Sequence, residues 1–471
     1  MPDTLAERFC GSSARARLDV AIAQLTAHFR DRVSTSSAHC EQHGRGEGQL
    51  RVYPPDAVVW PETTAEVSFI ASVCAREKVP LIAFGAGTSL EGHVCAPYGG
   101  ICVDLSRMNQ ILAVHAEDAE CIVQCGVTRE QLNVHLRDTG LYFPVDPGAN
   151  ATIGGMVATR ASGTTTLHYG ATAQNVRALE VVLANGNTIR CGTRAIKSSA
   201  GYDLVRIFVG SEGTLGIVTE VTLRLHPRLE ATGCITCAFP SVREAVDAAI
   251  ELVQSGMQLL RIEFLDEVQM RACNLYSNLE LPEKPTLFIE STGSATSVGE
   301  QVERTKEIVL AHGALNPDSA TTPEQRARLW RARHQAYYAT RAMRPGWNCI
   351  TSDVCVPISQ LADAVSATRQ DIDAAGLFAP ILGHVGDGNF HVIFMYDPAV
   401  DAARQAIDAL YDRMIARALA AGGTCTGEHG IGLGKRAKLV EESGEGAMTL
   451  MRQLKQAWDP DGILNPGKIF E

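Results

Sequence analysis

The chain has 471 residues, of which 45% are hydrophobic and 20% are charged. This length and this balance are typical of a globular protein of two or three domains, and they exclude a fibrous or a disordered chain. The 42 Lys and Arg against 53 Asp and Glu give a net charge of −11, which disfavours non-specific binding to nucleic acid. No run approaches the ~18 apolar residues of a membrane-spanning helix, so we expect no integral membrane segment.

The N-terminus and the cysteines bear on the compartment. The first residues have neither the apolar core of a secretion signal nor the acid-poor composition of a transit peptide, which predicts a cytoplasmic location. The 14 cysteines are scattered and predict reduced, buried thiols. The pairs Cys121/Cys125 and Cys234/Cys237 fall in predicted strands, with no further Cys or His at metal-binding spacing nearby.

The first 230 residues predict short helices and strands in quick succession. Residues 1–50 are expected to form an N-terminal helical segment. A helix is predicted to begin at Thr63–Glu66, because apolar residues then recur at positions 67, 70, 73 and 74. Asn185-Gly186 between two apolar runs predicts a hairpin. The remaining elements are strands at 57–60, 81–84, 101–104, 111–115 and 120–125, a helix at 128–138 and a long strand within 210–227.

From residue 230 the pattern changes to strands that alternate with longer helices. This alternation predicts a separate α+β domain in which helices cover a sheet. The expected strands are 232–239, 259–265, 285–291, 350–356, 379–384 and 389–396, and the expected helices are 241–254, 295–312, 323–341, 359–375 and 400–421. The tail, 437–471, is expected to be helical before it ends in NPGKIF.

Three glycine-rich loops stand out in the first part: FGAGTSLEGH (84–93), DPGANATIGGMVAT (146–159) and GSEGTLGIV (210–218). Glycine lets successive backbone N–H groups turn toward an anion and lets a phosphate approach closely. The first loop lacks the glycine spacing and the following helix of a Rossmann fingerprint. Three such loops instead favour an extended diphosphate cofactor held between two subdomains.

These loops, together with GHVGDGNFH (383–391), GEHGIGLGK (427–435) and NPGKIF (465–470), resemble the vanillyl-alcohol-oxidase-type, or PCMH-type, FAD flavoproteins. Residues 50–471 are most similar to the D-lactate dehydrogenase (cytochrome) and glycolate oxidase FAD-subunit branch. The resemblance implies an α+β fold with a two-lobed PCMH-type FAD-binding domain at 51–229. It also implies a substrate or cap domain with an antiparallel sheet at 230–425, and a C-terminal segment, 426–471, that returns to the FAD domain.

The resemblance also implies the residues that hold FAD. Those expected at the pyrophosphate are Gly85, Gly87, Thr88, Ser89 and Gly92. Those expected along the rest of the cofactor are Pro147, Gly148, Thr152, Gly154, Gly155, Ser162 and Gly163, with Glu212, Gly213 and Ile217 near its other end. Some relatives attach the flavin covalently through a loop histidine, for which His93 is the candidate. Because this branch usually binds FAD non-covalently, we expect non-covalent FAD.

A second group of residues points to a divalent metal. GHVGDGNFH predicts a strand, a tight turn and a strand, which brings His384 and His391 together although they are seven residues apart. Glu428 and His429 follow between glycines in GEHG. Two imidazoles and a carboxylate match a catalytic site for Zn²⁺ or Mn²⁺, with His384, His391 and Glu428 as ligands. The alternative is two structural histidines and a surface glutamate.

This constellation predicts the oxidation of a 2-hydroxy acid. A metal that binds the substrate lowers the pKa of its hydroxyl, and His429 is the candidate base that removes the proton. The α-hydrogen then leaves as hydride to flavin N5. Arg333 is the candidate for binding the substrate carboxylate, since its guanidinium offers a bidentate fork. Trp330 and Tyr337 are expected on the same helix face and in contact with the substrate.

Two departures from the family bear on the substrate. Relatives that act on D-2-hydroxyglutarate carry a polar residue where Ile393 stands and a lysine where Thr351 stands, so we expect a smaller substrate, D-lactate, which gives pyruvate. The sequence has no haem or iron–sulfur motif, so the electrons must pass to a separate cytochrome, quinone or flavoprotein, which can hold the chain at a membrane surface. Alternatives are the FAD subunit of a glycolate oxidase-like complex, a D-2-hydroxyglutarate-type dehydrogenase, an oxygen-using oxidase and a non-enzymatic flavin-binding protein.

Overall fold

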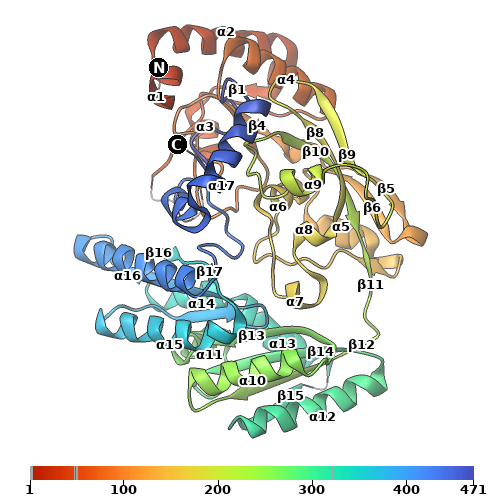
Figure 1. Ribbon diagram of the computed structural model, residues 1–471, viewed down its shortest axis with the longest axis vertical. Coiled ribbons are helices and arrows are strands. Elements are labelled where there is room, and N and C mark those ends of the chain that lie inside the picture. Colours follow the sequence, from red (N-terminus) through yellow and green to blue (C-terminus); the bar gives the residue numbers. More distant parts are fainter. Residues whose placement is uncertain (1–3, 47, 49–50, 321, 471) are drawn as a thin grey trace. The chain divides into compact units, whose positions relative to one another are not determined.

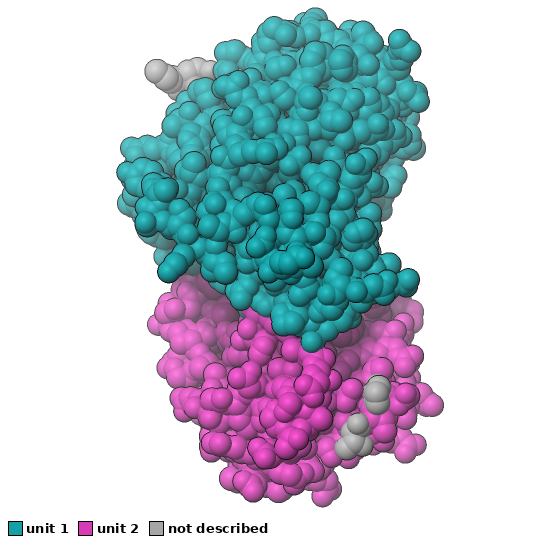
Figure 2. Space-filling model, turned by 90° about the vertical axis from the view of Figure 1, so that its right-hand side faces the viewer, with its two compact units in different colours: residues 1–162, 170–228, 428–471 teal, residues 163–169, 229–427 magenta. Residues whose placement is uncertain are grey.

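The computed structural model describes residues 4–46, 48, 51–320 and 322–470. The chain forms two compact units, coloured separately in Figure 2. Unit 1 comprises Met1–Ser162, Gly170–Arg228 and Glu428–Glu471, and unit 2 comprises Gly163–Tyr169 and Leu229–Gly427. Of the N-terminal segment expected at 1–50, residues 1–3, 47, 49 and 50 lie outside the described residues. Within the described ranges, no helix is long and apolar enough to cross a membrane.

The first lobe of unit 1 is built on a four-stranded sheet of order β1-β2-β4-β3, in which β2, β4 and β3 are parallel. Its strands are β1 (Val33–Ser34), β2 (Ala57–Val59), β3 (Leu81–Phe84) and β4 (Ile101–Asp104), and its helices are α1 (Leu5–Cys10), α2 (Ser12–Phe29), η1 (Arg30–Arg32), α3 (Ser37–His43), α4 (Thr64–Glu77) and η2 (Leu105–Arg107). The Thr63 hydroxyl accepts the N–H of Glu66 and so caps α4. This helix buries Val67, Ile70 and Val73, as its apolar period predicted.

The second lobe is a five-stranded antiparallel sheet of order β5-β6-β10-β8-β9. Its elements are β5 (Ile111–His115), η3 (Ala116–Asp118), β6 (Glu120–Gln124), α5 (Arg129–His135), η4 (Leu136–Asp138), β7 (Leu141–Tyr142), α6 (Ile153–Thr159), α8 (Thr172–Asn175), β8 (Val176–Val182), β9 (Thr188–Gly192), α9 (Leu204–Phe208), β10 (Ile217–Arg224) and β11 (His226–Pro227). The expected hairpin joins β8 to β9, and Gly186 takes a φ of 84° in its turn. Each lobe has its own apolar core, which confirms the two-lobed arrangement.

The C-terminal segment completes the first lobe. After α17 (Arg436–Trp458), the chain runs beside β3, where the Leu81 N–H donates to Ile463 at 2.8 Å and the Asn465 N–H donates to Leu81 at 2.9 Å. Leu464 is fully buried in the core of this lobe. The last residues of the chain are therefore an integral part of the first sheet.

Lys468 in this segment is 1% exposed, and its ammonium donates to the carbonyl of Cys95. Burial lowers the pKa of Lys468 to about 7. Between pH 7 and the ordinary pKa of lysine, the unfolded chain binds more protons than the folded one, so this group makes stability rise with pH. We expect the thermal midpoint of the wild-type protein to rise relative to that of Lys468→Met between pH 7 and 8.5. The effect corresponds to about 1 kcal/mol per pH unit.

The comparison with Lys468→Met removes the contribution of the buried thiols, which act in the opposite direction. Burial raises the pKa of Cys125 to about 12, so its titration lowers stability above the ordinary pKa of a thiol, equally in both proteins. Midpoints that stay parallel across this pH range contradict the assignment to Lys468.

Unit 2 is a single antiparallel sheet of order β15-β12-β14-β13-β18-β19-β16, with β17 also paired to β19. Its strands are β12 (Ala231–Ala238), β13 (Leu259–Leu265), β14 (Thr286–Gly293), β15 (Leu315–Ala320), β16 (Asn348–Thr351), β17 (Val354–Cys355), β18 (Ile381–His384) and β19 (Asn389–Tyr396). Its helices are α7 (Thr166–Tyr169), α10 (Val242–Gln254), α11 (Glu267–Ser277), α12 (Ala295–Ala311), α13 (Pro323–His334), α14 (Ala336–Met343), α15 (Ile358–Ala374) and α16 (Asp401–Ala420).

Helices cover this sheet as the sequence predicted (Figure 1). One face packs against α11, α13 and α14 through a core that includes Phe288, Trp330 and Met395. The other face packs against α10, α12, α15 and α16. The α+β fold class with an antiparallel sheet is therefore confirmed.

Two local predictions for unit 2 were wrong, and two elements were not predicted. The helix expected at 323–341 breaks at Gln335, which ends α13 and precedes α14, so that Trp330 and Ala336 both reach the core. The strand expected at 350–356 divides into β16 and β17 around Ser352, whose hydroxyl accepts the N–H of Val392 at 2.8 Å. The sequence also missed α11 and β15. The edge strand β15, Leu-Asn-Pro-Asp-Ser-Ala, has no alternating apolar pattern and forms through its pairing with β12.

Candidate active site

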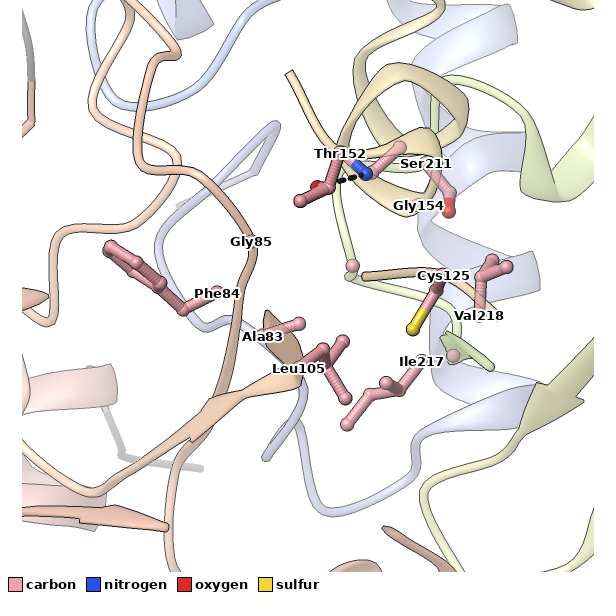
Figure 3. A pocket seen from close by; sticks show the side chains of 14 residues that line it. Ala83, Phe84, Gly85, Leu105, Cys125, Thr152, Gly154, Ser211, Ile217 and Val218 are labelled. Atoms are coloured by element: carbon pink, nitrogen blue, oxygen red, sulfur yellow. Dashed lines mark hydrogen bonds between the residues drawn. The ribbon is translucent and has the colours of Figure 1, made fainter. Parts of the chain in front are cut away.

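Unit 1 contains a cavity of about 480 Å³, counting the space at its open mouth. It is lined by Ala83, Phe84, Gly85, Leu105, Cys125, Thr152, Gly154, Gly155, Ala158, Ser211, Gly213, Gly216, Ile217 and Val218. Figure 3 shows Phe84 and Gly85 on one side of the cavity and Thr152, Gly154 and Ser211 on the other. Segments of all three glycine-rich loops thus contribute to the wall that encloses this cavity.

Glycine is required at two positions of this wall. A Cβ on Gly85 would lie 2.3 Å from the Thr152 hydroxyl oxygen, and one on Gly154 would lie 2.6 Å from Cβ of Cys125. The Thr152 hydroxyl accepts the Gly155 N–H at 3.3 Å, drawn as a dashed line in Figure 3. The lining has no charged side chain, since burial raises the pKa of the Cys125 thiol to about 12. Such a wall of backbone and apolar groups fits a flavin cofactor.

The structure places six of the residues expected at FAD on this cavity: Gly85, Thr152, Gly154, Gly155, Gly213 and Ile217. The others are not among its lining residues: Gly87, Thr88, Ser89, Gly92, Pro147, Gly148, Ser162, Gly163 and Glu212.

Glu212 has contacts of a different kind. It takes a φ of 54° and is buried, and its carboxylate accepts the N–H groups of Ile431 at 2.7 Å and Gly432 at 2.8 Å. His93 Nε2 lies 3.3 Å from the same carboxylate. Burial opposes ionisation of Glu212, but His93 and the two amides outweigh it and lower its pKa. Glu212 therefore anchors the loop that follows His429.

His384 and His391 come together across the β18–β19 hairpin of unit 2. Leu382 pairs with His391 in this register, so His384 and His391 lie on the same face of the sheet, with their ring centroids 5.6 Å apart. His384 Nδ1 lies 2.7 Å from a carboxylate oxygen of Glu263, and His391 Nδ1 lies 3.0 Å from the carbonyl of Ser352. Both acceptors favour the tautomer with its proton on Nδ1, in which Nε2 of the imidazole would be the metal-binding nitrogen.

A buried carboxylate that the sequence analysis missed lies beside this pair. Asp353 is fully buried, and one of its oxygens is 3.7 Å from His391 Nδ1. It accepts the side-chain amide of Asn389 at 2.8 Å and the hydroxyl of Thr426 at 2.7 Å. A Cβ on Gly427 would lie 2.2 Å from Asn389 Nδ2. The segment that precedes Glu428 is thus packed against the histidine hairpin.

Glu428 and His429 begin the last segment of unit 1. The Ser162 hydroxyl donates to a carboxylate oxygen of Glu428 at 2.6 Å. His429 Nε2 lies 3.9 Å from the other oxygen. The flanking Gly430 takes a φ of 81°, and a Cβ there would lie 2.7 Å from His93 Nε2. Ser162, expected at FAD, therefore orients the carboxylate that was expected at the metal.

Arg333 projects from α13 and is 6% exposed. Its Nη2 lies 2.5 Å from an oxygen of Glu263, and its Nε has no hydrogen-bond partner in the described part of the chain. Burial opposes ionisation of Glu263, but the charges of His384 and Arg333 outweigh it and lower its pKa.

The prediction that Trp330 and Tyr337 lie on the same face of one helix is wrong. Trp330 lies under the guanidinium of Arg261, which is 3.7 Å from its ring centroid. Tyr337 belongs to α14, beyond the break at Gln335, and its ring lies 5.8 Å from the guanidinium of Arg341. The aromatic residues therefore pack in the core around α13 and α14.

Comparison with known proteins supports the resemblance along the whole chain. A family model described as an FAD binding domain matches residues 55–192, and one described as FAD linked oxidases, C-terminal domain, matches residues 228–469. The chain is 48% identical over 471 residues to the probable mitochondrial D-lactate dehydrogenase of Danio rerio, covering 98% of this chain and 95% of the relative. It is 42% identical to the mitochondrial D-lactate dehydrogenase [cytochrome] of Arabidopsis thaliana (95% and 80% covered). It is 35% identical to the glycolate oxidase subunit GlcD of Bacillus subtilis (88% and 89% covered).

Two solved structures show the same fold at low sequence identity. The p-cresol methylhydroxylase structure with substrate bound has a TM-score of 0.82 at 18% identity and covers 97% of each chain. An alkyldihydroxyacetonephosphate synthase has a TM-score of 0.74 at 19% identity, covering 95% of this chain and 84% of the other.

These relatives also correct one expectation. The predicted cytoplasmic location is contradicted by the names of the Danio rerio, Arabidopsis thaliana and Saccharomyces cerevisiae relatives, all of which are mitochondrial D-lactate dehydrogenases. The glycine-lined cavity of unit 1, the His384–His391 hairpin of unit 2 and the nearly full-length relatives all indicate the same family. The chain belongs to the FAD-linked oxidases, in the PCMH-type branch that contains the D-lactate dehydrogenases and the glycolate oxidase subunit.

Proposed function

We propose that the chain is an FAD- and divalent-metal-dependent D-lactate dehydrogenase that oxidises D-lactate to pyruvate and passes the electrons to a separate acceptor. The observation that carries this proposal is the grouping of His384, His391 and Arg333 on one face of the sheet of unit 2. It combines two imidazoles poised as ligands with a buried cation suited to a carboxylate. The names of the relatives that match nearly full length support the same activity.

The proposed ligands of a Zn²⁺ or Mn²⁺ ion are His384, His391 and Glu428. The hydrogen bonds at both Nδ1 atoms prepare the two imidazoles for coordination through Nε2. The Ser162 hydroxyl fixes the Glu428 carboxylate. Glu428 directly follows Gly427, and the close packing of Gly427 against Asn389 of the hairpin supports its inclusion in the proposed ligand set.

When bound, FAD supplies a hydride acceptor at N5, and the metal supplies a positive charge beside the substrate hydroxyl. The residues of the chain provide the rest. Arg333 binds the substrate carboxylate. His429 takes the proton of the substrate hydroxyl as general base. The glycines around His429 and the anchored carboxylate of Glu212 set the path of this loop.

The residues at positions 351 and 393 favour a small substrate. Thr351 and Ile393 lie directly opposite each other in the β16–β19 register, and Ile393 is 1% exposed in the core around α13. A distal carboxylate left without a polar partner is costly to bury, and this pair offers only a hydroxyl and hydrocarbon. The methyl group of D-lactate is compatible with these two side chains, whereas a second carboxylate is not. The relatives named D-lactate dehydrogenase [cytochrome] favour a cytochrome as acceptor and a mitochondrial location.

An anaerobic absorbance titration tests this function. The purified protein is titrated with D-lactate, L-lactate, glycolate and D-2-hydroxyglutarate, with and without a chelator. Selective bleaching of the oxidised-flavin band by D-lactate, lost with the chelator and restored by Zn²⁺ or Mn²⁺, is the expected result. A flavin band that no acid bleaches contradicts the proposal. Selective bleaching by glycolate would favour the second candidate, an FAD subunit of a glycolate oxidase-like complex, which the similarity to GlcD supports.

A further inference from the structure

Glu263 occupies an unusual position for a carboxylate. It lies on β13, in the middle of the sheet of unit 2, and its side chain is fully buried. Strand alternation directs Arg261, Glu263 and Leu265 to the face covered by α11, α13 and α14. A carboxylate at the centre of a sheet is costly unless cations or hydrogen-bond donors surround it. Its partners therefore explain why it is there.

Each oxygen of Glu263 has its own partner, from a different element. Oε1 lies 2.7 Å from His384 Nδ1 on the neighbouring strand β18, and Oε2 lies 2.5 Å from Arg333 Nη2 on α13. The β13–β18 register pairs Phe264 with Gly383, which sets Glu263 opposite His384. The carboxylate thus bridges a strand and a helix that are about 50 residues apart in sequence.

The structure of a 2-hydroxy acid explains why His384 and Arg333 would need to be linked through Glu263. Its hydroxyl and its carboxylate stand on adjacent carbons, so the groups that bind them must keep a fixed separation. In the proposed function, His384 holds the metal for the hydroxyl and Arg333 binds the carboxylate. A carboxylate that is shared between these two side chains fixes one relative to the other.

We propose that Glu263 is a positioning residue that holds the metal ligand His384 and the carboxylate-binding Arg333 in one geometry, so that metal affinity and substrate affinity depend on the same side chain. This inference rests on the proposed function. The Nε of Arg333, buried and without a hydrogen-bond partner in the described structure, leaves a donor that a substrate carboxylate can satisfy while Nη2 stays on Glu263.

Glu290 provides a matched control. It lies on the neighbouring strand β14, is 4% exposed and accepts from Arg261 at 2.7 Å, and it contacts neither His384 nor Arg333 in the described structure. A purely structural role predicts similar consequences for Glu263→Gln and Glu290→Gln, because each change removes one buried carboxylate charge from the sheet of unit 2. The positioning role predicts that only Glu263→Gln alters the site.

The experiment measures Zn²⁺ affinity of the FAD-loaded protein by equilibrium dialysis with elemental analysis, together with FAD content and the kinetics of flavin reduction by D-lactate. Glu263→Gln is expected to keep FAD, to bind Zn²⁺ about tenfold or more weakly, and to retain a KM raised about tenfold when excess Zn²⁺ restores metal occupancy. Glu290→Gln is expected to have a Zn²⁺ affinity and a KM for D-lactate close to those of the wild type. Glu263→Asp, which keeps the charge but is too short to reach both partners, is expected to fall between wild type and Glu263→Gln.

Wild-type Zn²⁺ affinity in Glu263→Gln, or losses equal to those of Glu290→Gln, would overturn the positioning role while leaving the proposed function intact. A wild-type protein that binds no Zn²⁺ or Mn²⁺ overturns both. If Glu263→Gln does not fold, Glu263→Asp decides, since unchanged metal affinity in that variant also overturns the inference.

Discussion

His391→Ala is expected to lose the divalent metal and to abolish reduction of the flavin by D-lactate, while FAD stays bound. His391 supplies one of two imidazoles whose Nδ1 atoms are already engaged, and a site left with one histidine binds Zn²⁺ or Mn²⁺ weakly. A metal beside the substrate hydroxyl lowers the activation free energy by several kcal/mol. Without it, the rate of flavin reduction should fall by roughly a thousandfold. FAD is retained because the glycine-lined cavity belongs to unit 1.

Elemental analysis gives the metal content, the visible spectrum gives the FAD content, and anaerobic stopped-flow absorbance gives the reduction rate. His312→Ala is the control, because His312 is also in unit 2 but pairs with Glu251 near the surface. That variant should match the wild type in all three measurements. A His391→Ala protein that is still reduced at the wild-type rate would remove the metal from the proposed mechanism.

Arg333→Ala is expected to weaken D-lactate binding and to slow flavin reduction by a combined factor of roughly 10²–10³, on the scale of a lost charge-assisted contact to a carboxylate. The change also leaves Glu263 buried without its guanidinium partner, which costs about 3–5 kcal/mol of stability. Arg333→Lys keeps a cation for Glu263 but loses the planar fork, so it should recover stability more fully than substrate binding.

The dependence of the reduction rate on D-lactate concentration separates binding from turnover, and the thermal midpoint reports the stability. Arg331→Ala, an exposed position on the same helix, serves as the control. If Arg333→Ala loses stability but reacts with D-lactate as the wild type does, the arginine is only the structural partner of Glu263.

The sequence predicted those parts of the fold whose determinants are local. The apolar period of α4 and the Asn-Gly turn between β8 and β9 are readable within a dozen residues, and both were confirmed. The break at Gln335 and the edge strand β15 depend on packing against the sheet of unit 2, which no local pattern records. These elements were therefore predicted wrongly or missed.

The residues of the candidate site likewise differ in whether a local pattern or distant packing determines their position. His384 and His391 were paired from their hairpin, since a short glycine-rich turn between two strands determines where both fall. Asp353 and Ser352 were missed, because they reach His391 from the break between β16 and β17, nearly 40 residues earlier in the chain. The role of Glu263 could have been inferred from the sequence, since two charged residues interrupt the apolar strand Leu-Leu-Arg-Ile-Glu-Phe-Leu. Charges inside a central strand indicate buried partners, and a search for those partners leads to His384 and Arg333.

The pairing of β3 with the last residues of the chain imposes an order on biosynthesis. Leu81 emerges from the ribosome long before Ile463 and Asn465, which satisfy its backbone groups. At about 5–20 residues per second, the wait is roughly 20 to 80 s. During that time unit 2, whose segments all precede residue 428, can complete its sheet. The first lobe must meanwhile keep an unpaired strand edge, which is prone to pair with other chains until residues 463–465 have been synthesised.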